Sequence, residues 1–128
     1  MSLLQILVAS YLPDHVAPTG LRQSMRAARE RAESRGLTGG LLFDGEKFVQ
    51  LFAGPEDAAR QALAALHGDA LHERVNSLQA ADGLPDMAWR DWRVGYTEPA
   101  LLDSVLDAAV QGRALQAFAQ LMRGVDLA

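Results

Sequence analysis

One amide side chain stands out among the residues that could do chemistry. Gln50 interrupts the apolar run KFVQLFA at residues 47–53. Alternation along a strand would place Gln50 on one face together with Phe48 and Phe52. Because a buried amide requires hydrogen-bond partners, two explanations stay open. Either the amide lies at a sheet edge and binds water, or it faces a polar ligand held between a helix and the sheet.

The other reactive residue types form no recognisable catalytic or metal-binding set. His67 and His72 are five residues apart, which is not the spacing of one helical face, and no nearby carboxylate completes a metal site. The Gly39-Gly40 pair lacks the pattern of a phosphate-binding loop. The absence of cysteine excludes disulfides, Cys-based zinc sites and thiol catalysis. The sequence therefore predicts a protein that is not an enzyme and that holds no metal.

Length and composition limit the class of protein. The 128 residues suit one domain. Because 49% of the residues are hydrophobic, we expect the chain to be folded and not disordered. The net charge of -4 and the lack of a basic block argue against a nucleic-acid partner. The apolar run at residues 3–9 is too short to span a membrane and lacks the charged start of a signal peptide. We expect a cytoplasmic protein that does not bind membranes.

The elements that would position Gln50 follow from the apolar pattern. Residues 3–10 are predicted to form a strand that is buried on both faces. A helix is expected next, with Thr19 as its N-cap and Gly36 as its stop. Two strands joined by a turn at residues 44–46 complete the first half, and the second of these strands carries Gln50.

The second half of the chain supplies the remaining elements. A second helix is expected to begin at residues 54–57, because proline suits a first helical turn and acidic residues complement the helix dipole there. Residues 74–81 and 89–96 are predicted to be strands. The tail from residue 98 is predicted to be helical and to divide at Gly112.

This order predicts an α+β fold with a ferredoxin-like β-α-β-β-α-β-β sheet. Two helices would cover one face of the sheet, and the C-terminal helices would cover the other, since a sheet buried on both sides requires them. We therefore predict a domain at residues 1–97 and a helical extension, residues 98–128, that packs on the same domain.

Three strings in this order resemble the BLUF domain, a blue-light sensor that uses FAD. Residues 36–54, GLTGGLLFDGEKFVQLFAG, are similar to the family's Gly-Ile/Leu-Thr-Gly opening and its glutamine-bearing strand that ends in glycine. Residues 69–75, DALHERV, resemble its Asp-x-Arg-His-x-x-Val string. Residues 89–96, WRDWRVGY, resemble its Phe-x-x-Trp-x-Met-Gly-Phe/Tyr string. The resemblance covers about residues 3–97.

The resemblance implies a flavin ring between two helices, edge-on to the sheet. In the family, a tyrosine in the first strand and a glutamine in the third switch their hydrogen bonds under light. Gln50 stands at the position of this glutamine, and Trp92 stands at that of a fifth-strand tryptophan. Arg29 matches the arginine of a helical Ser-Arg pair, and His72 matches the histidine of the second string. The resemblance makes all four cofactor-binding candidates, together with the matched positions Val8, Ala28 and Ala32.

Other matched positions depart from the family. Val8 stands where the resemblance places the tyrosine, and Ala32 where it places a flavin-binding asparagine. Two further positions are apolar where the family has a polar residue: Ala28 for a serine and Leu71 for an arginine. Val94 stands at the position of a methionine. Valine can give neither an electron nor a proton, so we expect the tyrosine-based photocycle to be lost. The small alanines leave room for a ligand, whereas an apolar cleft could also close by packing.

Three hypotheses of function follow. The first is a sensory and signalling domain that binds FAD without the blue-light photocycle. The alternative is a flavin-free interaction or regulatory module on the same fold, which Val8 and Ala32 favour. A small enzyme ranks last, because no acid–base or nucleophilic set emerges. We further expect a homo-oligomer and a separate downstream protein partner.

Overall fold

The computed structural model describes residues 2–19, 21–85, 87 and 89–125. The elements follow the order β1 (Leu3–Tyr11), α1 (Arg22–Ser34), β2 (Thr38–Phe43), β3 (Lys47–Pro55), α2 (Glu56–His67), β4 (Glu73–Asp82), β5 (Trp92–Tyr96), α3 (Pro99–Val110) and α4 (Ala114–Arg123). None of the described helices combines the length and the apolar character that a membrane span requires.

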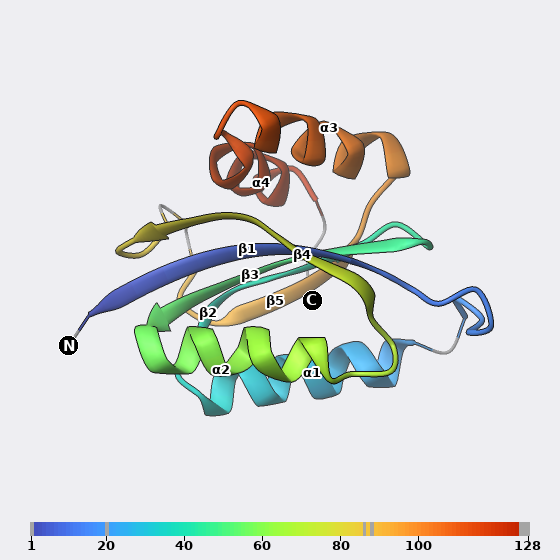
Figure 1. The fold of residues 1–128 in the computed structure, drawn as a ribbon, viewed down its shortest axis with the longest axis horizontal. Helices are drawn as coiled ribbons and strands as arrows, with labels where there is room; N and C mark the ends of the chain where they lie inside the picture. Colours follow the sequence, from blue (N-terminus) through green and yellow to red (C-terminus); the bar gives the residue numbers. More distant parts are fainter. Residues whose placement is uncertain (1, 20, 86, 88, 126–128) are drawn as a thin grey trace.

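The strands form one mixed sheet in the order β4-β1-β3-β2-β5. The pairs β1–β4, β1–β3 and β2–β3 are antiparallel, and β2 pairs with β5 in parallel. Helices α1 and α2 lie against one face of this sheet, and α3 and α4 lie against the other (Figure 1). The predicted α+β, ferredoxin-like arrangement is confirmed.

Two apolar cores lie on the two faces of the sheet. In β1, Leu4, Ile6 and Val8 face α1 and α2, whereas Leu7 and Ala9 face α3 and α4. This confirms the predicted strand that is buried on both faces. The helices of the tail bury five side chains in the second core: Leu102, Val105, Ala114, Phe118 and Met122. The tail therefore covers the sheet of its own chain.

The start of α1 differs from the prediction, and its end agrees with it. The helix begins at Arg22, with Leu21 at the N-cap position and no side-chain cap, so the predicted cap by Thr19 is wrong. Leu21 is buried in the core, and its carbonyl accepts the Met25 N–H at 2.9 Å. Burial of an apolar side chain, which a capping rule does not consider, sets this boundary. Gly36 follows the helix with a φ of 75°, a conformation that favours glycine.

The last strand is shorter than predicted. The strand expected at residues 89–96 begins only at Trp92, because the residues before it bind β2 by other means. The Trp89 indole N–H donates to the Gly39 carbonyl at 3.0 Å, and the Thr38 hydroxyl donates to the Asp91 carbonyl at 3.0 Å. Side-chain hydrogen bonds thus add to the backbone bond from the Gly39 N–H to the Asp91 carbonyl, at 3.3 Å, in this segment.

The predicted turn and the division of the tail are both confirmed. In the β2–β3 turn, Asp44 Oδ1 accepts the backbone N–H groups of Glu46 at 2.9 Å and Lys47 at 2.8 Å, which closes the hairpin. Gly112, with a φ of 71°, separates α3 from α4.

Candidate functional site

Gln50 lies near the centre of the sheet, on the face that α1 and α2 cover. Its Cα partners are Val8 in β1 and Leu41 in β2, and its side chain is only 2% exposed. The sheet-edge explanation for this amide is therefore wrong. Among the described residues, no group pairs with Gln50 Nε2. Because a buried unpaired donor costs about 1–3 kcal/mol, this amide is suited to an acceptor on a ligand.

A cavity of about 90 Å³ adjoins this amide between α1 and α2. A second cavity, of about 270 Å³, shares Ala28, Arg31, Asp69 and His72 with the first, and we call the two together the α1–α2 cleft. The further lining of the first cavity is Ala32, Arg35, Gln50, Phe52, Ala62, Ala65 and Leu66. The alanines of α1 leave this space, because larger side chains there would fill it.

His72 closes one end of the cleft. Its Nδ1 is 2.8 Å from the hydroxyl of the fully buried Ser10, and its ring lies 4.4 Å from the Phe48 ring. Burial lowers the pKa of His72, an effect that Asp69 opposes and Arg31 reinforces. The imidazole is therefore neutral at neutral pH and can act as one hydrogen-bond donor and one acceptor.

Trp92 is buried beside the cleft. Its indole N–H donates to the Leu51 carbonyl at 2.8 Å, and its ring stacks on Phe52 with 5.9 Å between ring centroids. The indole reaches β3 across Gly39, which is the Cα partner of both Trp92 and Phe52. A Cβ on Gly39 would lie only 2.2 Å from the Leu51 oxygen. The glycine thus lets the strands and the indole approach, and Trp92 touches the cleft through Phe52.

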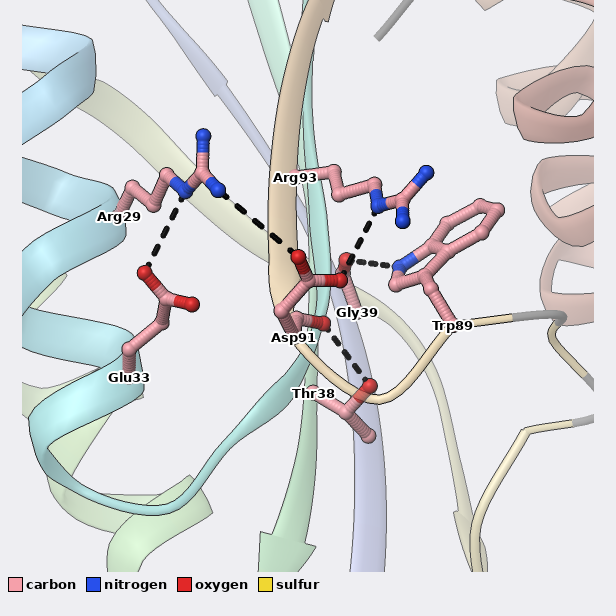
Figure 2. Close-up of polar contacts among 7 residues, drawn as sticks. All are labelled: Arg29, Glu33, Thr38, Gly39, Trp89, Asp91 and Arg93. Atoms are coloured by element: carbon pink, nitrogen blue, oxygen red, sulfur yellow. Dashed lines mark hydrogen bonds and ion pairs between the residues drawn. The ribbon is translucent and has the colours of Figure 1, made fainter. Parts of the chain in front are cut away.

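Arg29 does not line the α1–α2 cleft. It pairs with Glu33 at 3.3 Å and with Asp91 at 3.8 Å, and Asp91 also accepts from Arg93 at 3.0 Å (Figure 2). The Arg93 guanidinium in turn lies 5.0 Å from the centroid of the Trp89 ring. These contacts tie α1 to the segment before β5, so Arg29 connects elements where the resemblance had suggested a cofactor contact.

Apart from Arg29, the positions matched to the family lie in or near the cleft. Ala28, Ala32, Gln50 and His72 line it, and Leu71 lines its second cavity. The predicted residue of the first strand, Val8, is the fully buried strand neighbour of Gln50, although its side chain does not line the cleft. Val94 packs against the edge of the same core.

Sequence reasoning missed three polar residues of the first cavity: Arg31, Arg35 and Asp69. A signal for the two arginines existed, because helical spacing places positions 28, 31, 32 and 35 on one stripe of α1. Of the charged residues in this helix, only Arg29 is predicted from the sequence to lie in the site, because only Arg29 matches a family position. Within the described part of the chain, no group of three potential metal ligands occurs.

The sequence model of the BLUF family, described as sensors of blue-light using FAD, matches residues 3–95. The chain belongs to the BLUF family. A BLUF domain is a sensory domain rather than a catalytic one, and the family binds flavin. No curated protein sequence matches this BLUF chain.

Several solved structures share the fold of this BLUF domain. BlrB, a BLUF protein in its dark state, has a TM-score of 0.73 and 23% identity over 94% of this chain and 95% of its own. The BLUF part of BlrP1 has a TM-score of 0.69 and 20% identity over 95% and 88%. BlsA in its photo-activated state has a TM-score of 0.65 and 16% identity over 83% and 78%.

Longer proteins contain the same fold as one part. BlrP1 from Klebsiella pneumoniae, in a complex with calcium and cyclic di-GMP, has a TM-score of 0.64 and 21% identity over 86% of this chain. This chain spans only 28% of that BlrP1 chain and 40% of a bacterial light-regulated adenylyl cyclase.

Proposed function

We propose that this BLUF domain is a sensory module that binds FAD in the α1–α2 cleft and that it lacks the tyrosine-dependent photocycle. The observation that carries the proposal is the Gln50 amide, which adjoins the cavity with an unpaired Nε2. The edge of a flavin ring presents carbonyl oxygens and ring nitrogens as acceptors, which suit such a donor. When bound, a flavin supplies absorption of visible light and redox chemistry.

The residues of the chain would hold and orient this group. Gln50 Nε2 would donate to an acceptor on the ring edge, and Ala28 and Ala32 leave space beside α1 for the ring. His72, neutral and held by Ser10, can place one more donor or acceptor at the end of the cleft. Val8 adds only packing beside Gln50, so no proton or electron can come from it.

An absorption spectrum of the purified protein after refolding with FAD tests this proposal. We expect a visible flavin band that stays with the protein through gel filtration and that does not shift under blue light. The Gln50→Leu variant should retain less flavin, because it removes the donor while keeping the side-chain size. Gln61→Leu, the same change at an exposed position of α2, is the matched control and should retain as much as the wild type.

Two outcomes would contradict the proposal. A protein that stays colourless after refolding with FAD would show that the cleft takes no flavin. A light-induced shift of the flavin band would show that another residue replaces the tyrosine.

A flavin-free interaction module is the second candidate. It is favoured by the cavity volumes of about 90 and 270 Å³, which fall below the roughly 300–1,000 Å³ of small-molecule pockets. In either case we propose that residues 1–97 form the sensory part and residues 98–128 the part that contacts a downstream protein. We also propose a cytoplasmic homo-oligomer, and light scattering of the purified protein would give its mass.

A further inference from the structure

Two arginines stand at the mouth of the α1–α2 cleft. Arg31 and Arg35 lie one helical turn apart on α1, and both line the first cavity. In the described part of the chain, neither guanidinium makes a side-chain hydrogen bond or an ion pair. Arg29 on the same helix is different, since it is paired with Glu33 and Asp91. The cleft therefore has two cations with unused donors.

The residues that line the cleft become more exposed and more charged from its floor to its mouth. Gln50 at the floor is 2% exposed, whereas Arg35 is half-buried and Arg31 is exposed. Asp69 is the acidic residue among those that line the first cavity, and its Oδ1 accepts the Leu71 N–H at 2.9 Å. His72 carries no charge at neutral pH, because burial lowers its pKa. Two cations against one anion leave the mouth net positive.

We propose that Arg31 and Arg35 form an anion-binding rim that selects ligands with a planar, acceptor-bearing ring and a phosphate tail. The ring end would lie near the Gln50 amide, and the phosphate would lie between the guanidiniums. Arginine suits this part, because its planar fork binds phosphate through paired hydrogen bonds. The inference rests on the proposed function for the ring. It adds that FMN and FAD are bound in preference to riboflavin, which has the same ring without a phosphate.

Titration of the wild-type protein with FMN, FAD and riboflavin, followed by flavin fluorescence at low salt, tests this rim. We expect FMN and FAD to bind at least about tenfold more tightly than riboflavin, as one charge-assisted hydrogen bond would provide. The double variant Arg31→Gln, Arg35→Gln should lose this preference and bind riboflavin as the wild type does. Added salt should reduce the difference in affinity between the phosphate-bearing flavins and riboflavin in the wild type.

A matched control is available on the same helix. Arg26 is exposed on α1 and does not line the cleft, so Arg26→Gln removes one positive charge without changing the rim. We expect this control to keep the wild-type preference for FMN. Equal affinity for FMN and riboflavin in the wild type would contradict the proposed rim, and so would an unchanged preference for FMN in the double variant. Neither result would contradict the proposal that the domain binds a flavin.

Failure of the proposed function gives a different result. If no flavin binds, the protein is titrated with inorganic pyrophosphate instead. Binding is then monitored through the NMR signals of the His72 ring, which lies in the cleft with Arg31. A saturable shift in the wild type that is absent from the double variant would support the rim without a flavin. Signals that pyrophosphate leaves unmoved would overturn it.

Discussion

At the scale of single residues, the site departs from the family pattern beside Gln50. Val8 is the Cα partner of Gln50, so a tyrosine at position 8 would stand next to the amide, as the family's switch requires. The strand pairing that the switch needs is thus present, and the chemistry of one side chain is missing. Under the proposed function, the residue at position 8 decides whether blue light can start the tyrosine-dependent photocycle.

The double change Val8→Tyr, Ala32→Asn tests this view. It adds polar groups at two positions that have become apolar, and two new hydrogen bonds would raise flavin affinity about tenfold or more. Flavin titration measures the effect. The control Val8→Phe, Ala32→Leu adds similar bulk without hydrogen-bonding groups. If the polar pair gains nothing over this control, packing has closed the cleft.

His72 should make the stability of the fold depend on pH. Because its pKa in the folded state lies below the ordinary 6.5, the unfolded state binds more protons as the pH falls through 6.5. The free energy of unfolding should therefore decrease on acidification below about pH 6.5, by at most about 1.4 kcal/mol per pH unit. Urea unfolding from pH 7.5 to 5.5 measures this slope.

Two variants separate the His72 effect from other titrations. His72→Gln should flatten the dependence of the free energy of unfolding on pH between about pH 6.5 and 5.5. An unchanged slope would mean that other titrating groups cause this dependence. Arg31→Gln should raise the pKa of His72 in an NMR titration, because the positive charge that disfavours the imidazolium is removed.

At the scale of elements, the two glycines of β2 let this strand lie close to both of its neighbours. Gly39 admits the Leu51 carbonyl of β3, which also accepts the Trp92 indole N–H. A Cβ on Gly40 would lie 2.3 Å from the Arg93 oxygen in β5 and 2.7 Å from Met122 in α4. The Gly-Gly pair is therefore a packing feature of the sheet.

Gly40→Ala should destabilise the protein by roughly 1–3 kcal/mol, as overpacked cores do. The backbone oxygen of Arg93 cannot move aside as a flexible side chain could. Gly124→Ala is the control, because a Cβ there would lie an ordinary 3.7 Å from its nearest neighbour, the Leu121 oxygen. Urea unfolding compares the two variants, and equal effects would contradict the steric argument.

At the scale of the whole molecule, the C-terminal helices are joined to the sheet by polar contacts as well as by the second core. Lys47 of β3 is 4% exposed, and its Nζ lies 2.6 Å from Asp44 in the hairpin and 2.8 Å from Asp103 in α3. The Gln79 side chain in β4 accepts the Leu115 N–H in the first turn of α4 at 2.9 Å. The hairpin next to Gln50 is thus connected to the tail.

The two ion pairs of Lys47, with Asp44 and with Asp103, should contribute differently to the free energy of unfolding. Lys47→Met leaves the buried Asp44 carboxylate without its cation and should cost about 3 kcal/mol. Asp103→Asn should cost less than about 1 kcal/mol, because the Asp103 side chain is 62% exposed. Urea unfolding at neutral pH measures both, and a larger cost for Asp103→Asn would contradict the assignment.

The same lysine has a predicted pH dependence. Burial by itself would lower the pKa of Lys47, but its hydrogen bonds and charge pairing with Asp103 and Asp44 outweigh burial and raise it. Its stabilising contribution is therefore complete below the ordinary value of 10.5 and is lost as the pH rises through the raised pKa. The gap in stability between the wild type and Lys47→Met should persist to pH 10 and shrink only above it.

The sequence by itself determined the elements, their order and the face of β3 that carries Gln50. Apolar periodicity, turn residues and glycine stops act over a few neighbouring residues, so a linear sequence displays them. The same signals placed the start of α1 at Thr19 and that of the last strand at residue 89. Both boundaries depend on contacts with distant residues, and local rules do not include such contacts.

Only the tertiary structure decided which polar residues meet in the cleft. Arg29 pairs with Asp91, which lies far along the chain, whereas Arg31 and Arg35 face the space beside α2. The three arginines have the same chemistry in the sequence. Their surroundings differ because the packing of α1 against β5 on one side and beside α2 on the other directs each one to a different neighbour.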